Sequence, residues 1–372
     1  MTPRRRLVRR ALIVLAPLGL VACGGQPDST ATTATPTTTF RTVPASTADT
    51  TAAPSTSTTL EPTTTMAETT TTVAETTTTV PAGPVFPLTG LPAPDPFSVG
   101  RVALVVKIDN APGARPQTGF NAADLVVEEI VNDNLTRFAM VFQSQSSNPV
   151  GPIRSGRLQD IDLFSMLNHP LFAWSGGNAT VTRAIDSSDL VNVGPNHVHA
   201  YYRDSSRAAP HNLYSKTDDL WANAPADSSP PPQLFDYLAP GESPAGDPTS
   251  AIAIKLDSID VRWDWDDADH RYLRTMEGKA HNDKAGGQIS TDNVVVLSMD
   301  YTPGISGSPD AQTVGDGEVF VLTGGRMVHG TWARADIHDR FTLTADDGTP
   351  IRLTPGRTFI ELPRVSSTLP IP

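Results

Sequence analysis

Hydrophobic and polar residues alternate over residues 85–235 in a pattern that predicts strands and short helices. Residues 102–109 (Val-Ala-Leu-Val-Val-Lys-Ile-Asp) are almost continuously apolar, which is typical of a buried strand. Further strands are expected at 125–131, 138–142 and 171–174. Apolar residues at helical spacing predict helices over 157–167, 178–185 and 212–222. This alternation predicts an α/β domain over residues 85–235.

The remainder of the chain has the pattern of a β-rich domain, expected over residues 245–372. Prolines and glycines are concentrated in residues 224–250, which is typical of a connecting segment. Short apolar runs separated by turn residues then predict a twisted antiparallel sheet or partial barrel. Its expected strands are 251–256, 261–265, 272–275, 293–299, 320–322, 327–332, 341–344 and 358–362.

The first 84 residues have the pattern of a secretory leader followed by a flexible linker. Five arginines between Arg4 and Arg10 precede a short apolar stretch, which is typical of a secretory leader. Leu20-Val-Ala-Cys23 resembles a bacterial lipobox, so residues 1–23 are expected to be a lipoprotein signal peptide and Cys23 the lipidated residue. Residues 24–84 contain 25 threonines and are expected to be a disordered Thr/Ser/Pro-rich linker. Such a coil spans about 45 Å. This part predicts an extracytoplasmic protein anchored to the cell membrane by its lipid.

Composition narrows the possible functions. The net charge is −12, which argues against a nucleic-acid partner because such binding needs a basic surface. Cys23 is the one cysteine of the chain, so neither an intrachain disulfide nor a cysteine-based zinc site can form. No phosphate-binding loop, dinucleotide fingerprint or serine-hydrolase elbow occurs, and no cofactor is indicated.

Arginines in polar, Gly/Pro-punctuated segments are the densest chemical signal. Guanidinium groups match the geometry of phosphate and carboxylate. Ser155 and the corner at Gly176 and Gly177 precede predicted helices, whose N-termini attract anions. We therefore expect an anion or polar-ligand cleft, while structural pairing of the arginines with nearby acids remains an alternative. The arginines are Arg115, Arg137, Arg154, Arg157, Arg203 and Arg207.

Other polar residues join this candidate site. Asp109 and Asn110 end the first buried strand, a usual place for ligand-binding residues in α/β sheets, although an Asx turn explains them equally well. His211 and Asn212 can orient a ligand, and His211 can also be a general base or a helix cap. Asp124 and Asp109 are candidate bases. His197 and His199 have the spacing of two metal ligands on a strand, but no third ligand stands out, so no metal site is predicted.

Several ordered motifs resemble the YerB-like family of bacterial lipoproteins, a two-domain family of unknown function. In the first half these are Asp109-Asn110, Arg115-Pro-Gln-Thr-Gly119, Ala123-Asp124, Glu128, Thr136-Arg137-Phe138, Gly151-Pro-Ile-Arg154-Ser-Gly-Arg157 and Pro210-His211-Asn212. In the second they are Tyr272-Leu-Arg274, His281-Asn-Asp283, Gln288, Asn293-Val-Val-Val296 and Gly330-Thr-Trp332. The resemblance covers about residues 85–365, with Thr118 and Phe120 departing from it. It implies an envelope location and a two-domain layout, and no particular reaction.

Three hypotheses of function follow. The first is a lipoprotein that binds an anionic or glycan-like envelope ligand through an arginine-lined cleft. The second is an enzyme acting on envelope polymers, phosphotransferase-like or hydrolytic, in which the arginines stabilise developing charge. The third is a non-catalytic scaffold for a protein partner, which predicts an exposed apolar patch around Trp263, Trp265 or Trp332.

Overall fold

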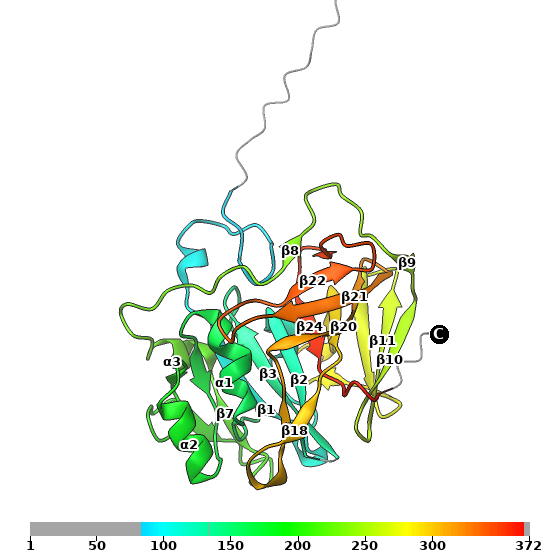
Figure 1. Ribbon diagram of the computed structural model, residues 1–372. Helices are drawn as coiled ribbons and strands as arrows, with labels where there is room; N and C mark the ends of the chain where they lie inside the picture. Colours follow the sequence, from blue (N-terminus) through cyan, green and yellow to red (C-terminus); the bar gives the residue numbers. More distant parts are fainter. Residues whose placement is uncertain (1–82, 133, 368–372) are drawn as a thin grey trace, which may run out of the picture. The chain divides into compact units, whose positions relative to one another are not determined.

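The computed structural model describes residues 83–132 and 134–367, so the predicted leader, Cys23 and nearly all of the linker lie outside the described residues. The described part consists mostly of β-strands, and its two halves follow one another along the chain (Figure 1). Its α-helices are α1 (Gln159–Phe164), α2 (Ala179–Asp186) and α3 (Thr217–Trp221). None of the helices described is long and apolar enough to cross a membrane.

Strands from both halves of the chain form one large sheet. Its order is β22-β21-β20-β17-β24-β2-β3-β1-β4-β5, with β9 (Asp247–Pro248) paired to β21. The bounds are β1 (Leu104–Asp109), β2 (Leu125–Asn132), β3 (Leu135–Phe142), β4 (Leu171–Ala173), β5 (Val191–Asn192), β17 (Asn293–Leu297), β20 (Gly315–Thr323), β21 (Arg326–Arg334), β22 (Thr342–Ala345) and β24 (Thr358–Glu361).

The two halves meet where β2 runs parallel to β24. In this pairing Leu125 lies opposite Thr358 and Glu128 opposite Glu361. Strand β24 is also parallel to β17, so the last long strand of the chain lies between one strand from each half. The two halves of the chain therefore both contribute strands to one sheet.

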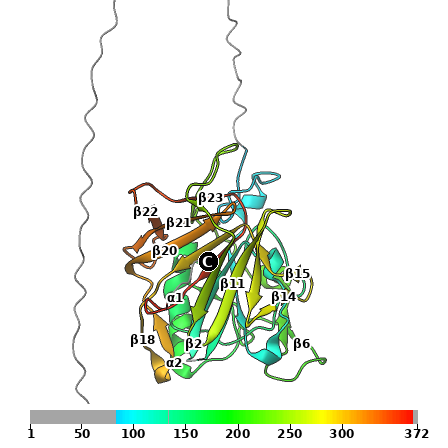
Figure 2. The ribbon, with the colours of Figure 1, turned by 90° about the vertical axis from the view of Figure 1, so that its right-hand side faces the viewer.

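A smaller sheet covers one face of the large one. It consists of β10 (Ala251–Leu256), β11 (Ile259–Asp266), β12 (Arg271–Met276), β13 (Lys279–Ala280) and β16 (Ser290–Thr291). Figure 2 shows β11 in front of β2, with α1 behind it. Alternate residues of β1 to β3 pack toward this smaller sheet, and the others pack toward α1 and α2. The remaining pairs are β6 (Tyr201–Arg203) with β7 (Leu213–Ser215), β8 (Asp236–Tyr237) with β23 (Arg352–Leu353), β14 (Asn282–Asp283) with β15 (Gly287–Gln288), and β18 (Tyr301–Pro303) with β19 (Pro309–Ala311).

Three local expectations are wrong. The helix expected over 212–222 is shortened to α3, because its first residues form β7 and pair with β6. The segment with His197 and His199 is a turn region, so the two rings do not share a strand face. Trp263 and Trp332 are buried in the two cores, which removes them from the apolar patch that the partner hypothesis required.

Candidate functional site

One face of β1, β2 and β3 packs against α1, and charged side chains lie at the edge of its apolar part. Val105, Val127 and Ala139 lie on this face, and the next positions along it include Lys107, Glu129 and Arg137. Arg137 lies opposite Asp109 on β1 and opposite Glu129 on β2. The sheet register therefore places one arginine between two acids in a buried position.

Arg137 has little hydrogen bonding for a buried guanidinium. Its side chain donates one bond, from Nη1 to the carbonyl of Ser155 at 3.1 Å, and its Nε has no partner. Burial, followed by the neighbouring charge of Arg157, lowers the pKa of Arg137 to about 10. In the described ranges no acid lies within ion-pairing distance of this group, so its positive charge is incompletely satisfied.

Arg154 and Arg157 reach the same place from the loop before α1. The loop is fixed because the Arg154 N–H donates to the Lys107 carbonyl at 2.9 Å and the Ser175 N–H donates to the Arg154 carbonyl at 2.9 Å. Arg154 Nε lies 3.3 Å from Asp109 Oδ2 without forming a hydrogen bond. Arg157 donates to the carbonyl of Gly156 at 3.0 Å, and its Nε also has no partner. Three buried guanidinium Nε atoms thus lack an acceptor.

Lys107 lies next to these arginines, between two buried carboxylates. It pairs with Glu129 and, at 2.6 Å, with Asp160 of α1. Burial, and then the charge of Asp160, raises the pKa of Glu129 to about 7. We call Lys107, Asp109, Glu129, Arg137, Arg154, Arg157 and Asp160 the arginine cluster. Its four basic groups face three acids, so it carries excess positive charge within an acidic protein.

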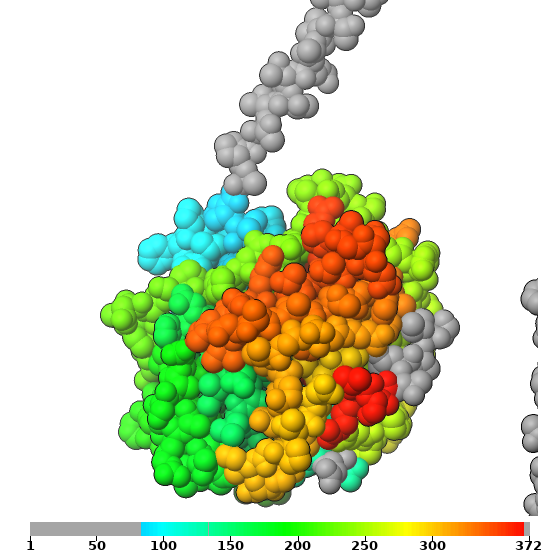
Figure 3. All heavy atoms as spheres, in the orientation of Figure 1, coloured from blue at the N-terminus to red at the C-terminus, as the bar shows by residue number. Residues whose placement is uncertain are grey.

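A cavity of about 660 Å³ opens beside Arg157. Gly156, Gly177 and Asn178 line it together with this arginine, and the β18–β19 hairpin tip, Ile305–Gly307 with Ser308, lines the other side. Figure 3 shows the yellow-orange hairpin tip, at the bottom of the view, beside the green part of the chain. The remaining lining residues are Asn132, Asn134, Leu135 and Val181. Arg157 and the corner residue Gly177, both predicted site residues, therefore line the same cavity.

The N-termini of α1 and α2 offer fewer free N–H groups for an anion than expected from the sequence. The carboxylate of Asp160 accepts the Arg157 N–H at 2.6 Å, and α1 is under two turns long. At α2, the side chain of Asn178 accepts from the N–H groups of Thr180 and Val181 at 2.9 and 3.0 Å. The α2 corner is thus capped by Asn178, whereas α1 has no side-chain cap and is too short to form an anion site by itself. Any ligand here would be held mainly by side chains, and Ser155 contributes its carbonyl to Arg137.

His211 adjoins the cluster through Asp109. The buried Oδ2 of Asp109 accepts from His211 Nδ1 at 2.7 Å, and Oδ1 accepts from the Ala111 N–H at 3.1 Å. A carboxylate only accepts, so Nδ1 carries the proton and Nε2 of the neutral ring has a free lone pair. The structure thus brings together two residues of the predicted site, Asp109 and His211.

The other predicted arginines have structural partners. Arg207 donates to the carbonyls of Ala114 and Pro116 at 2.7 and 2.6 Å, and Arg203 donates to Asn212 Oδ1 at 2.7 Å. Arg115 pairs with Glu277 and also donates to Asn110. These contacts hold loops together, but of the three arginines only Arg115 pairs with an acid among the described residues, as the structural-pairing alternative expected.

Asp124 does not join the arginines. Its carboxylate accepts from the N–H groups of Gln143 and Ser144 at 2.5 and 2.8 Å and from the Ser144 hydroxyl. Burial raises its pKa, and these hydrogen bonds oppose that rise. Asp124 precedes β2, whereas Glu129 lies further along that strand. Its expected role as a base at the arginine cleft is therefore wrong for this geometry.

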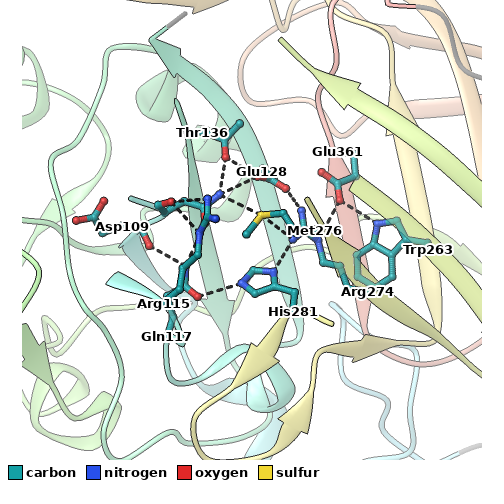
Figure 4. Close-up of polar contacts among 11 residues, drawn as sticks. Asp109, Arg115, Gln117, Glu128, Thr136, Trp263, Arg274, Met276, His281 and Glu361 are labelled. Carbon is teal, nitrogen blue, oxygen red and sulfur yellow. Dashed lines mark hydrogen bonds and ion pairs between the residues drawn. The ribbon is translucent and has the colours of Figure 1, made fainter. Parts of the chain in front are cut away.

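A second buried polar group lies on the opposite face of the same strands (Figure 4). Arg274 of β12 pairs with Glu128 and lies 3.5 Å from Glu361. Trp263 Nε1 donates to Glu361 at 2.9 Å, and Arg274 contacts His281 Nδ1. We call Glu128, Arg274, His281 and Glu361, with Trp263, the central ion network.

The central ion network continues into the first half of the chain. Gln117 contacts His281 Nε2 at 3.0 Å and donates to Asn110 Oδ1 at 3.2 Å, while Asn110 donates to Thr136 at 2.7 Å. Burial, and then the Glu128 carboxylate, raises the pKa of Glu361 well above its ordinary value. Burial, and then Arg274, holds the pKa of His281 well below its usual range. Asn110 thus belongs to this interior network.

Comparison with known families agrees with this two-part connectivity. Residues 88–229 match the model described as "Protein of unknown function (DUF3048) N-terminal domain", and residues 252–360 match the DUF3048 C-terminal domain. The chain belongs to the DUF3048 family. The YerB-like resemblance seen in the motifs is confirmed by these matches.

The chain is also similar, in sequence and in structure, to a protein of Bacillus subtilis. The chain is 25% identical over 286 residues to YerB of strain 168, whose name describes it as a candidate lipoprotein. This alignment covers 74% of the chain and 85% of the relative. A crystal structure of YerB from Bacillus subtilis superposes with a TM-score of 0.67 at 22% identity, covering 77% of this chain and 99% of that one. The two proteins therefore share their fold.

The sequence did not single out Lys107, Glu129 and Asp160 as members of the site. A signal was available, because Lys107 and Glu129 interrupt apolar strands that are otherwise buried, apart from Asn132 at the end of β2. Buried lysines and glutamates are uncommon unless they are paired. The same signal marks Glu128 and Glu361, which only strand pairing brings together.

Proposed function

We propose that this DUF3048 protein is a membrane-anchored extracytoplasmic lipoprotein that binds an anionic, glycan-like ligand of the cell envelope at the arginine cluster. The N-terminal sequence supports the anchor through its lipobox-like Cys23, and the relative YerB supports it through its name. Two or more acyl chains on one residue give stable membrane attachment. The Thr-rich linker would then let the described part work away from the membrane.

The observation that carries the binding proposal is the set of three buried Nε atoms without acceptors. Arg137, Arg154 and Arg157 supply these atoms, and two of the three guanidinium groups have no acid within ion-pairing distance in the described part. A buried, unsatisfied charged donor costs more than an ordinary missing bond. A bound anion would offset the excess positive charge, and from the cavity it would meet the guanidinium group of Arg157.

The cavity supports a ligand larger than a simple ion. Its volume of about 660 Å³ is within the range of small-molecule sites. Asn132 and Asn178 offer side-chain amides at its wall, and Ser306 and Ser308 lie on the facing hairpin. Amides and hydroxyls suit the hydroxyl groups of a sugar, while Arg157 suits its charged substituent.

Calorimetric titration with sulfate tests the binding proposal, because sulfate stays doubly charged over the working pH range. Arg157→Met is expected to fold normally and to weaken sulfate binding about 10- to 100-fold, since a hydrogen bond to a charged group contributes about 1.5–3 kcal/mol. Arg262→Met is the matched control, because its guanidinium is exposed on β11 and pairs with Asp264. Equal affinities of wild type and Arg157→Met would refute the assignment.

The anchor has its own test. Mass spectrometry of the N-terminal peptide should find acyl chains on Cys23, and Cys23→Ser should move the protein from the membrane fraction to the soluble fraction. A Cys23→Ser protein that remained in the membrane fraction would contradict lipid anchoring through this residue.

A further inference from the structure

His211 differs from the other histidines that contact carboxylates through Nδ1. His329 holds Asp346 with Nδ1 at 2.7 Å and Glu318 with Nε2 at 3.0 Å, and His338 likewise places an aspartate on each nitrogen. His211 holds Asp109 with Nδ1 at 2.7 Å, and its Nε2 has no partner among residues 83–132 and 134–367. One ring nitrogen is thus fixed and the other is free.

The fixed side of this ring is rigid and the free side is accessible. Asp109 is 1% exposed, and its Oδ1 accepts the Ala111 N–H, so the carboxylate cannot turn away easily. The His211 side chain is 25% exposed. Gly113 lies against the ring edge, where an added Cβ would be 3.1 Å from Cδ2 and 3.6 Å from Nε2. The absence of a side chain at Gly113 keeps that edge open.

The same carboxylate joins His211 to the arginine cluster. Asp109 Oδ2 receives His211 Nδ1 and also lies 3.3 Å from Arg154 Nε. A buried carboxylate that orients a histidine with a free Nε2 is the arrangement by which imidazole takes protons in hydrolytic enzymes. Arginines beside it are suited to the oxygens of a phosphoryl group, on which charge is spread during transfer.

We propose that His211 and Asp109 form a catalytic dyad that hydrolyses a phosphate ester bound by the arginine cluster. This proposal rests on the anion-binding function and goes beyond it from binding to turnover. His211 is the catalytic residue, Asp109 positions it, and Arg154 with its neighbours holds the phosphate oxygens.

The reaction uses one water molecule from solvent. The water oxygen forms a bond to phosphorus while His211 Nε2 takes one of its protons. The bond from phosphorus to the ester oxygen breaks, and that oxygen leaves with the bonding electron pair. The imidazolium then returns the proton to the leaving oxygen. The products are an alcohol and a phosphate with one ester bond fewer, and the enzyme regains its starting state.

The full-length chain in detergent is assayed with p-nitrophenyl phosphate and bis(p-nitrophenyl) phosphate, which distinguish a monoesterase from a diesterase. Wild type is expected to hydrolyse one of the two. His211→Gln should lower kcat by about 100-fold or more, as for other general bases, with little change in KM. His329→Gln is the matched control, because it also has an Nδ1–carboxylate contact, and its rate should equal that of wild type.

Two further variants separate catalysis from structure. Imidazole added to His211→Ala should restore part of the rate, which a purely structural histidine would not allow. Gly113→Val should press on the ring edge and lower kcat while leaving sulfate affinity unchanged. Asp109→Asn should lower kcat with KM retained.

Each outcome decides between the two proposals. A wild-type protein that binds sulfate but hydrolyses neither ester overturns the dyad and leaves anion binding intact. Full activity of His211→Gln, or no rescue of His211→Ala by imidazole, also overturns it. Failure of the wild type to bind sulfate would refute the binding function as well.

Discussion

Arg274→Met is the substitution that most directly tests how the central ion network stabilises the fold. Arg274 is fully buried, pairs with Glu128, lies 3.5 Å from Glu361, and stacks over the Phe359 ring at 5.1 Å from its centroid. Methionine preserves most of the length and apolar contact of the side chain. The substitution therefore removes mainly the charge that compensates two buried carboxylates.

The expected loss of stability is about 3–5 kcal/mol, which is typical of removing one partner from a buried ion pair. For a folded unit of this size, each kcal/mol lowers Tm by about 2–4 °C, so the expected decrease is about 6–20 °C. The control Arg262→Met removes an exposed pair with Asp264 and should cost less than about 1 kcal/mol.

The pH dependence gives a sharper test. The pKa of Glu361 is raised in the folded protein, so the folded state binds more protons than the unfolded state above the ordinary value near 4.5. Stability therefore falls as the pH rises toward the raised pKa. Removing Arg274 raises that pKa further, so the loss should be larger at pH 8 than at pH 5.

Thermal unfolding followed by circular dichroism at both pH values measures these effects. Adding Glu128→Gln and Glu361→Gln to Arg274→Met should recover part of the loss, because no buried charge then remains unpaired. A decrease in Tm below 2 °C, or an equal decrease at pH 5 and pH 8, would refute this account of the network.

Further predictions concern the arginine cluster and two glycines. Sulfate binding should weaken as the pH rises through about 7, because Glu129, whose pKa burial raises to about 7, gains negative charge there; calorimetry at pH 6 and 8 measures this, and Glu129→Gln should abolish the difference. Gly246→Ala should lower Tm markedly, because its φ is +92° and an added Cβ would lie 2.1 Å from the Met327 carbonyl oxygen. Gly348→Ala, at φ +84° with open space around it, controls for backbone strain, and an equal Tm for both variants would contradict the steric explanation.

The strands were largely predictable because their apolar patterns are local. Residues 251–256 coincide with β10, and the run at 102–109 contains β1. Strand β24 was also predicted, but its position beside β2 was not. Parallel pairing between residues more than 200 positions apart leaves no mark on either strand, so one shared sheet could not be deduced from local periodicity.

The candidate site was predictable only in part for the same reason. Arg154 and Arg157 were identified by residue type, and Asp109 by its position at a strand end. Which of the six arginines gather there depends on tertiary structure. Sheet register places Arg137 opposite Asp109 and Glu129, and the loop before α1 brings Arg154 beside Asp109. Arg203 and Arg207 have equally suggestive sequence surroundings, and their loops direct them to carbonyls and to Asn212 instead.

Adjacent residues of β2 connect the two charged groups. Side chains alternate along a strand, so Glu128 faces the central ion network and Glu129 faces the arginine cluster. Arg274 has two acids within ion-pairing distance, whereas Arg137 and Arg157 have none in the part of the chain described by the structure. The first face therefore holds the sheet together, whereas the second keeps arginines without ion-pair partners among the described residues, one of which, Arg157, lines a cavity. Substitutions of Glu128 should accordingly change stability more than anion affinity, while substitutions of Arg157 should do the reverse.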